Sequence, residues 1–258
     1  MERLTVIKIG GHVLDDERQL ETFLKVFASL EGPRILIHGG GKMATRIAEQ
    51  QGIKVTMVDG RRLTDQAMLD VVIQVYGGWV NKALVGGLQK LGCNALGLTG
   101  ADGNLIKAHK RPVAKIDYGF VGDVDQVNEQ LVHLLLTNGI IPVCAPLTHD
   151  GNGQMLNTNA DTIASSVAVA MANKYKVDLV YGFEKAGVLK DVNDDRSIIP
   201  VITKEQYADW KQDGTISGGM IPKLDNAFAA IDQGVSQVVI GLATDIANKK
   251  SGTRLIKE

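Results

Sequence analysis

Lys8 is the charged residue whose surroundings in the sequence most need an explanation. It belongs to an otherwise apolar stretch, LTVIKI at 4–9, that is followed directly by Gly10 and Gly11. A buried ammonium group costs several kcal/mol unless an opposite charge or a ligand pairs with it. Lys8 therefore either reaches water from the end of a strand or binds an anion.

Lys223 and Asp161 raise the same question at the starts of two predicted helices, 219–233 and 160–174. A helix N-terminus disfavours a cation, so Lys223 is either an indifferent exposed lysine or a lysine with an anionic ligand nearby. Asp161 suits a helix start by its charge alone, and it follows the pair Asn157 and Asn159. Two amides spaced by two residues point the same way in an extended chain, where they could bind a small polar ligand. Capping of the helix by Asn159 or Asp161 is the structural alternative.

Glycine-rich turns follow two of the predicted strands. Gly10 and Gly11 follow the first, and Gly40 and Gly41 belong to the segment HGGGK that follows a strand at 34–38. Such turns expose backbone N–H groups where a helix dipole also favours negative charge. A tight turn that simply requires glycine is the alternative. Two such loops, one beside a lysine, favour anion binding.

Other motifs leave alternatives open. The segment HGGGKM does not match the P-loop, which requires Ser or Thr after its lysine. Gly39, Gly41 and Ala44 do match the dinucleotide pattern G-x-G-x-x-A, and Asp59 ends the next predicted strand, so an NAD-binding oxidoreductase is a competing hypothesis. Arg62, in the segment DGRRLT, could bind a carboxylate with its planar fork, or it could belong to an ordinary solvated pair.

Composition excludes several classes of protein. The chain has 258 residues, a formal net charge of −1 and 45% hydrophobic residues, enough for one large domain or two lobes. Without a long Lys/Arg run, we expect no nucleic-acid partner. Its two cysteines, Cys93 and Cys144, form no CxxC motif and indicate a reducing, cytoplasmic protein. We expect no signal peptide, and the apolar runs are too short to span a membrane.

Short apolar runs alternate with longer amphipathic ones, which predicts an α/β fold with an open, mostly parallel sheet between helices. Residues 101–125 break this rhythm and are interpreted as a hairpin excursion, and a softer boundary lies near 174–178. The predicted strands are 4–9, 34–38, 54–58, 94–98, 140–145, 178–181 and 236–241, and the predicted helices are 16–30, 42–51, 65–91, 126–138, 160–174, 203–212 and 219–233.

Taken together, these motifs resemble the amino acid kinase family almost from end to end. The matching motifs are K-x-G-G (8–11), H-G-G-G (38–41), G-x-R-x-T (60–64), N-x-N-A-D (157–161), G-G-M-x-x-K (218–223) and G-T-R (252–254). The resemblance implies a three-layer fold in a single domain, 1–258. It also implies an N-lobe of about 1–175 that binds an acyl amino acid and forms a homodimer, and a C-lobe of about 176–258 that binds ATP.

Within that family the third and fourth motifs, G-x-R-x-T and N-x-N-A-D, point to the acylglutamate branch. The implied reaction is phosphoryl transfer from ATP, with Mg²⁺, to the side-chain carboxylate of N-acetyl-L-glutamate in arginine biosynthesis, with N-succinyl-L-glutamate as the alternative substrate. Such a transfer needs alignment and positive charge more than covalent chemistry from the protein.

The resemblance also assigns roles. Lys8 and Lys223 would neutralise the phosphoryl group in flight, and Asp161 would hold both ammonium groups. Arg62 would bind the α-carboxylate of the substrate. Asn157 and Asn159 would bind other polar groups of the substrate. Backbone N–H groups would donate to phosphate and substrate oxygens at Gly10, Gly11, Gly40 and Gly41.

The chain departs from the family pattern after the strand at 178–181. There the segment YGFEKAGVL resembles a nucleotide-contacting loop, with Glu184 and Gly187 as candidate ATP contacts, but Phe183 and Glu184 replace an expected Ser/Thr-Asp pair. This change motivates a further alternative, a sensor without catalysis. Another member of the same family, a carbamate, uridylate or aspartate kinase, is a competing hypothesis, because these kinases share the K-x-G-G start. The sequence starts without the extra helix of arginine-inhibited hexameric relatives, so we expect a dimer without arginine feedback.

Overall fold

A computed structural model describes the chain except for residues 59, 192, 195, 217–219 and 249–250. Its centre is an eight-stranded sheet in the order β12-β14-β13-β11-β1-β2-β8-β5. Among the described strand pairs of this sheet, only β13–β14 is antiparallel. The strands are β1 (Arg3–Ile9), β2 (Arg34–His38), β5 (Ala95–Leu98), β8 (Ile141–Cys144), β11 (Lys176–Phe183), β12 (Val201–Thr203), β13 (Gln237–Leu242) and β14 (Thr253–Ile256).

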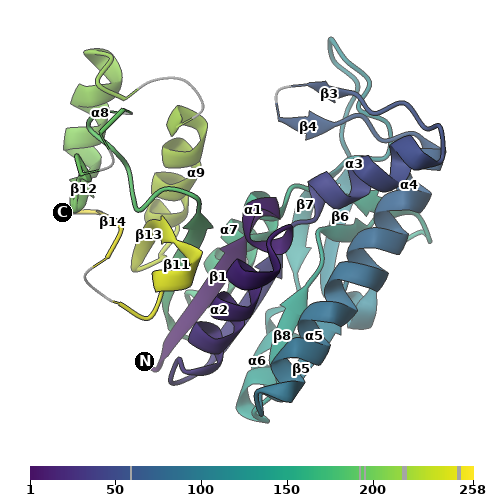
Figure 1. Ribbon diagram of the computed structural model, residues 1–258, viewed down its shortest axis with the longest axis horizontal. Coiled ribbons are helices and arrows are strands. Elements are labelled where there is room, and N and C mark those ends of the chain that lie inside the picture. The colour runs from purple at the N-terminus through teal and green to yellow at the C-terminus, as the bar shows by residue number, and fades with distance from the viewer. Residues whose placement is uncertain (59, 192, 195, 217–219, 249–250) are drawn as a thin grey trace.

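Helices cover both faces of this sheet, so the predicted α/β fold with an open, mostly parallel sheet is confirmed (Figure 1). One face packs against α1 (Gly11–Leu14), α2 (Glu17–Ala28), α3 (Gly41–Gln50), α4 (Gln66–Val72), the π-helical segment η1 (Ile73–Val80) and α5 (Asn81–Lys90). The other packs against α6 (Glu129–Thr137), α7 (Ala160–Met171), α8 (Lys204–Gln212) and α9 (Met220–Asp232).

The side chains of β1 show how the two faces arise. Leu4 and Val6 belong to the core on the α7 and α9 face, whereas Ile7 and Ile9 belong to the core on the α2 and α3 face. Side chains alternate between the faces of a strand, so Lys8 shares the α7 and α9 face with Leu4 and Val6. The apolar pattern of this strand therefore also determines where its single lysine points.

The excursion at 101–125 is a real hairpin within a second, four-stranded sheet of order β10-β9-β6-β7. Its strands are β6 (Ile106–Lys110), β7 (Gly122–Val127), β9 (Leu147–His149) and β10 (Met155–Asn157), preceded by the short 3₁₀ turn η2 (Asp102–Asn104). The sequence analysis missed β9 and β10, because each has only three residues. It also missed the short strands β12 and β14.

The predicted strand 54–58 is wrong over most of its length. Only its last two residues are a strand, β3 (Met57–Val58), which pairs with β4 (Arg61–Arg62) in a small hairpin outside the main sheet. Met57 is exposed, and Val55 packs against the core while only partly buried, so the apolar residues of this segment do not mark a buried strand. The predicted helix 65–91 is continuous, but its middle is the π-helical segment η1.

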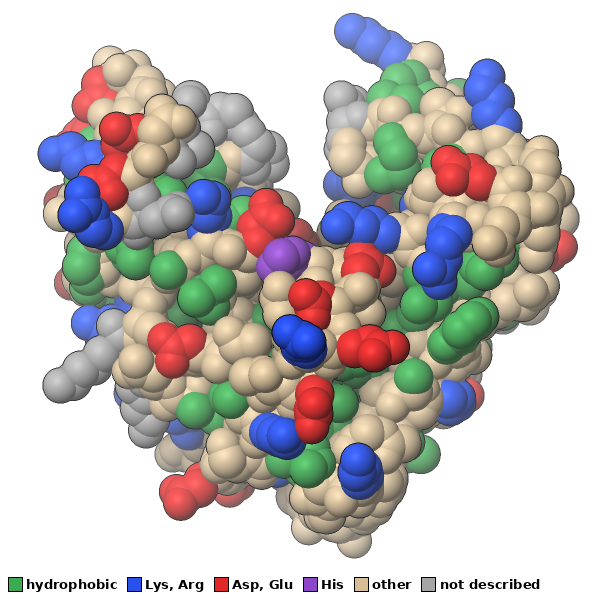
Figure 2. All heavy atoms as spheres, in the orientation of Figure 1, with side chains coloured by type: hydrophobic (Ala, Val, Ile, Leu, Met, Phe, Trp, Pro, Cys, Tyr) green, Lys and Arg blue, Asp and Glu red, His purple; other side chains and the backbone are tan. Residues whose placement is uncertain are grey.

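The chain forms two parts with a hollow between them, which opens upward in Figure 2. The β3–β4 hairpin lies on one side of the hollow, and α8 and α9 lie on the other (Figure 1). Four neighbouring strands of the main sheet come from residues before 175 and four from residues after it. The division into an N-lobe and a C-lobe stays a prediction. In the described part of the chain, no helix has the length and apolarity that crossing a membrane requires.

Candidate active site

Lys8 and Lys223 both contact the carboxylate of Asp161. The ammonium nitrogen of Lys8 lies 2.8 Å from Asp161 Oδ1, and that of Lys223 lies 3.4 Å from Oδ2. The three side chains retain only 16%, 18% and 27% of their exposure, in the order Lys8, Lys223, Asp161. Two cations held on one anion in a sheltered place leave a net positive charge at this point.

Three separate elements deliver these side chains. Lys8 comes from the carboxyl end of β1, Asp161 from the first turn of α7, and Lys223 from the first turn of α9. The α7 start is fixed by Asn159, whose Oδ1 accepts hydrogen bonds from the backbone N–H groups of Asp161 and Thr162. The carboxyl edge of a parallel sheet is where α/β proteins bind ligands.

Burial and charge act against each other on these groups. Burial alone would raise the pKa of Asp161, but the charges and hydrogen bonds of Lys8 and Lys223 outweigh it and lower that pKa. The pKa of Lys223 is lowered, first by burial and also by the charge of Lys8, against the opposing effect of Asp161. Asp161 therefore stays ionised at neutral pH.

Aromatic rings complete the surroundings of Lys223. Its ammonium nitrogen lies 4.9 Å from the ring centre of Tyr181 and 5.3 Å from that of Phe183. Ring faces attract cations at such distances. Phe183, one of the two residues that depart from the family pattern, thus contacts a predicted catalytic lysine.

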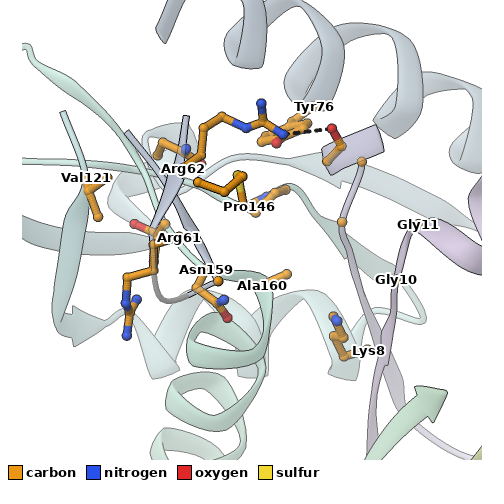
Figure 3. A pocket seen from close by; sticks show the side chains of 17 residues that line it. Lys8, Gly10, Gly11, Arg61, Arg62, Tyr76, Val121, Pro146, Asn159 and Ala160 are labelled. Carbon is orange, nitrogen blue, oxygen red and sulfur yellow. Dashed lines mark hydrogen bonds between the residues drawn. The ribbon is translucent and has the colours of Figure 1, made fainter. Parts of the chain in front are cut away.

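Lys8 also borders a cavity of about 220 Å³ that most of the predicted site residues line (Figure 3). Met57, Arg61, Tyr76 and Pro146 also line this space. The predicted residues gathered here are Lys8, Gly10, Gly11, Gly40, Gly41, Arg62, Asn157 and Asn159.

Arg62 is held in the cavity wall by a firm set of contacts. Its Nη2 donates to the Gly41 carbonyl and to Thr45 Oγ1, both at 2.9 Å, and the residue is 7% exposed. The buried ring of Tyr76 lies beside it, and burial raises the pKa of that phenol. A guanidinium fixed in this way is preorganised to bind a carboxylate.

The two glycine loops contact each other next to Lys8. A Cβ added to Gly39 would lie 3.8 Å from Gly10 Cα and 4.0 Å from Gly11 N. Gly40 has φ of +149°, which other residues rarely adopt, and a Cβ there would lie 2.9 Å from the Tyr76 ring. Helix α3 begins at the next residue, so its unsatisfied N–H groups also face this end of the loop.

The two asparagines each have a structural partner as well as a place in the cavity wall. Asn157 donates from Nδ2 to Thr64 Oγ1 at 3.0 Å. The Oδ1 of Asn159 caps α7, so the capping alternative is correct for that oxygen. Both residues line the cavity, so capping does not account for the pair.

Glu184 and Gly187 do not line this cavity. Glu184 is exposed, in the loop after β11. Gly187 is buried, and a Cβ there would lie 2.8 Å from both Ile198 Cγ2 and Thr253 Oγ1. Thr253, from the G-T-R motif, accepts the Val188 N–H at 2.7 Å, so that motif closes this loop. Asp59, Gly218 and Gly219 lie outside the described residues.

The sequence analysis missed three residues of the site, Thr45, Tyr76 and Tyr181. Each of them lies in a helix or strand that the sequence predicts. The periodicity of that element does not show which residues from other elements the side chain contacts. Tyr76 and Trp79 are the aromatic residues of the predicted helix 65–91, and this was the signal available for Tyr76.

Comparison with known proteins identifies the family. The sequence model of the amino acid kinase family matches residues 3–241, so the chain belongs to that family. The acetylglutamate kinase of Phocaeicola vulgatus is 57% identical over 256 residues, which cover 99% of each chain. This full-length match rules out the NAD-binding oxidoreductase hypothesis.

Solved structures agree on the fold. The protein smu.665 of Streptococcus mutans UA159 aligns with a TM-score of 0.78 at 28% identity, over 99% of both chains. A carbamate kinase of Giardia lamblia bound to AMP-PNP aligns with a TM-score of 0.74 at 14% identity, over 100% of this chain and 99% of that one.

Proposed function

We propose that this enzyme transfers the terminal phosphoryl group of ATP to the side-chain carboxylate of N-acetyl-L-glutamate, a step of arginine biosynthesis. The observation that carries the proposal is the pairing of Lys8 and Lys223 on Asp161 at the edge of a cavity that contains a fixed arginine. A kinase for a carboxylate needs this combination, because both the phosphoryl group and its acceptor are anions.

The lysines would act on the group in transfer. A carboxylate is already a nucleophile at neutral pH, so the reaction needs no general base. Lys8 and Lys223 would neutralise the charge on the phosphoryl oxygens, and Asp161 would keep both ammonium groups apart and in place. The acceptor oxygen attacks phosphorus, the bond to the bridging oxygen breaks, and ADP leaves as an acyl phosphate forms.

The cavity would hold the acceptor. Arg62 would pair with the α-carboxylate of N-acetyl-L-glutamate, while Asn157 and Asn159 bind its other polar groups. The N–H groups of Gly40 and Gly41 would donate to substrate and phosphoryl oxygens. The cavity volume of about 220 Å³ suits a small amino-acid derivative rather than a nucleotide.

The nucleotide would approach from the loop after β11, with its phosphates at the edge of the cavity. Gly10 and Gly11 would donate to its phosphates, and Glu184 and Gly187 belong to the loop proposed to contact the rest of ATP. The described residues contain no group of three His, Cys, Asp or Glu side chains that could hold a metal ion. We propose that Mg²⁺ arrives on the ATP phosphates, an arrangement Mg²⁺ favours.

We propose that the acyl group of the substrate is acetyl. The relatives at 47–57% identity are named acetylglutamate kinase. N-Succinyl-L-glutamate is the alternative substrate, whose additional carboxylate could pair with Arg61, a second arginine in the cavity wall. Arg61 also has an interaction within the protein, and the names of the relatives favour the acetyl compound.

The test is trapping of the acyl phosphate by hydroxylamine, with ATP and Mg²⁺ and either N-acetyl-L-glutamate or N-succinyl-L-glutamate. We expect hydroxamate with the acetyl compound and little with the succinyl compound. Hydroxamate from neither, in a folded protein that binds ATP, would reject the kinase and favour the sensor alternative.

Two further features belong to the proposal. We propose a homodimer, as the family resemblance implies, and light scattering of the purified protein tests it. We also propose a cytoplasmic location, because Cys93 and Cys144 are buried free thiols, as expected in a reducing compartment.

A further inference from the structure

His38 precedes three glycines of the site, and the reaction described above gives its side chain no role. The residue is fully buried. Its Nδ1 lies 2.7 Å from the carbonyl oxygen of Gly39, and its Nε2 lies 3.1 Å from Nδ2 of Asn81. A carbonyl oxygen only accepts hydrogen bonds, so Nδ1 must carry a proton.

The partners of Asn81 determine the state of the other ring nitrogen. Asn81 Nδ2 also donates to the Val143 carbonyl at 2.9 Å, and its Oδ1 accepts from the Lys82 ammonium at 3.1 Å. This orientation of the amide is unambiguous, because a carbonyl cannot donate and an ammonium cannot accept. Nδ2 therefore donates to His38 Nε2, which must be unprotonated.

His38 is thus a neutral imidazole with its proton on Nδ1. Burial, the largest effect, lowers its pKa to about 4, and the charge of Lys82 acts in the same direction. Gly97 makes room for this arrangement, because a Cβ there would lie 1.9 Å from Asn81 Oδ1. The network joins β2, β5, β8 and the start of α5.

The hydrogen bond to Gly39 has a consequence for the next residue. The C=O and N–H of one trans peptide point in opposite directions, so a carbonyl held by His38 sends the Gly40 N–H away from His38. The other side of the loop is also held, because the Gly39 N–H donates to the Ile9 carbonyl at 3.0 Å. Gly40 itself lines the cavity.

The π-helical segment η1 explains how two residues close together in one helix, Tyr76 and Asn81, both contact this loop or the residue before it. Asn81 donates its backbone N–H to the Tyr76 carbonyl, five residues back. Residues five apart lie about 140° apart around an α-helix, but a π turn brings them closer to one face. Tyr76 accordingly covers Gly40 while Asn81 holds His38.

We propose that His38, held by Asn81 as the neutral Nδ1–H tautomer, is a positioning residue that aims the Gly40 N–H at the transferred phosphoryl group. The inference rests on the proposed kinase function. It adds to that function the residue that sets the orientation of the Gly40 N–H. His38 does not touch substrate and acts only through the peptide between Gly39 and Gly40.

The first test is spectroscopic and needs no substrate. Long-range ¹H–¹⁵N spectra of the protein with labelled histidine resolve the tautomer of each of its five histidines, and His38→Gln assigns the signal. We expect the neutral Nδ1–H pattern for His38 at neutral pH. An Nε2–H pattern, or a charged ring, would overturn the proposal.

The second test compares two variants by kinetics. An Asn side chain can place its N–H near the position of Nδ1, whereas Gln places it near Nε2. We expect His38→Gln to lower kcat about 10- to 100-fold, less than loss of a whole oxyanion donor, with KM for both substrates nearly unchanged. His38→Asn should recover most of that loss at a similar Tm.

Equal loss of kcat in both variants, in step with Tm, would mark His38 as a packing residue and overturn the proposal. The same holds if His38→Gln retains wild-type kcat. A wild-type protein that forms no acyl phosphate overturns the proposed function and, with it, this role in the reaction. An active wild type with the Nε2–H tautomer overturns this inference alone.

Discussion

Lys8 and Lys223 contact different oxygens of one carboxylate, that of Asp161, at 2.8 Å and 3.4 Å. The first lysine lies on β1 and the second on α9, more than two hundred residues later in the chain. The pair joins β1, which borders the cavity, to α9 on the other side of the hollow, so residues before and after 175 contribute to one centre of positive charge.

Replacement of Lys8 should remove transition-state stabilisation. We expect Lys8→Met to lower kcat by about 10²- to 10³-fold, the range for loss of one donor to developing charge. Lys25→Met is the matched control, because Lys25 is exposed and pairs with its helix neighbour Glu21, away from the cavity. Hydroxamate formation measures both variants, and equal activity in the two would contradict the role of Lys8.

The activity should fall at alkaline pH through Lys223. Burial and the charge of Lys8 lower its pKa below the ordinary 10.5 despite the opposing Asp161, so its positive charge is lost earlier than in an exposed lysine. The profile of kcat against pH should therefore descend below pH 10.5. Lys223→Arg, whose guanidinium stays charged, should shift this descent upward. A descent unchanged in Lys223→Arg would assign it to another group.

Arg62 should act mainly on binding of the acceptor. We expect Arg62→Lys to raise KM for N-acetyl-L-glutamate by about 10- to 100-fold, because a charge-assisted bond contributes roughly 1.5–3 kcal/mol. KM for ATP should change little. The exposed Arg46→Lys, on the same helix as Thr45, is the control. A large rise in KM for ATP instead would place Arg62 on the nucleotide side.

His38 should make stability depend on pH in the acid range. Its pKa is about 4 in the folded protein against 6.5 ordinarily, so the unfolded chain binds the proton first. Stability is full above pH 6.5 and falls as pH decreases toward 4, by roughly 3 kcal/mol in total. Urea unfolding at pH 7 and pH 5 should show a smaller decrease in His38→Asn than in the wild type. Equal decreases would mean that His38 does not titrate this way.

Much of the fold was predictable, because its elements carry strong local patterns. The apolar runs at 4–9 and 34–38 became β1 and β2, and the odd composition of 101–125 did indicate a hairpin. The short strands β9, β10, β12 and β14 were not predictable in this way. Unlike β5 and β8, which are as short as β14 but belong to apolar runs, these strands each include a polar residue, and their pairing depends on partners distant in the chain.

Parts of the site were equally readable. Lys8, beside two glycines at the end of a buried strand, and Asn159 with Asp161 at a helix start were recognised from local chemistry, and the structure gathers them at one edge of the sheet. Tyr76 and Asn81 were not, because their common face exists only in a π-helical turn. A helical pattern in the sequence does not distinguish that turn from an α-helix.

The sequence by itself determined the family, the α/β class and the residue types of the site, because these depend on composition and short-range spacing. Only the tertiary structure decided that Lys8 and Lys223 share Asp161, that Asn159 both caps a helix and lines the cavity, and that His38 is neutral. Each of these depends on distances between segments far apart in the chain. Burial and charge act through those distances, and spacing along the sequence does not contain them.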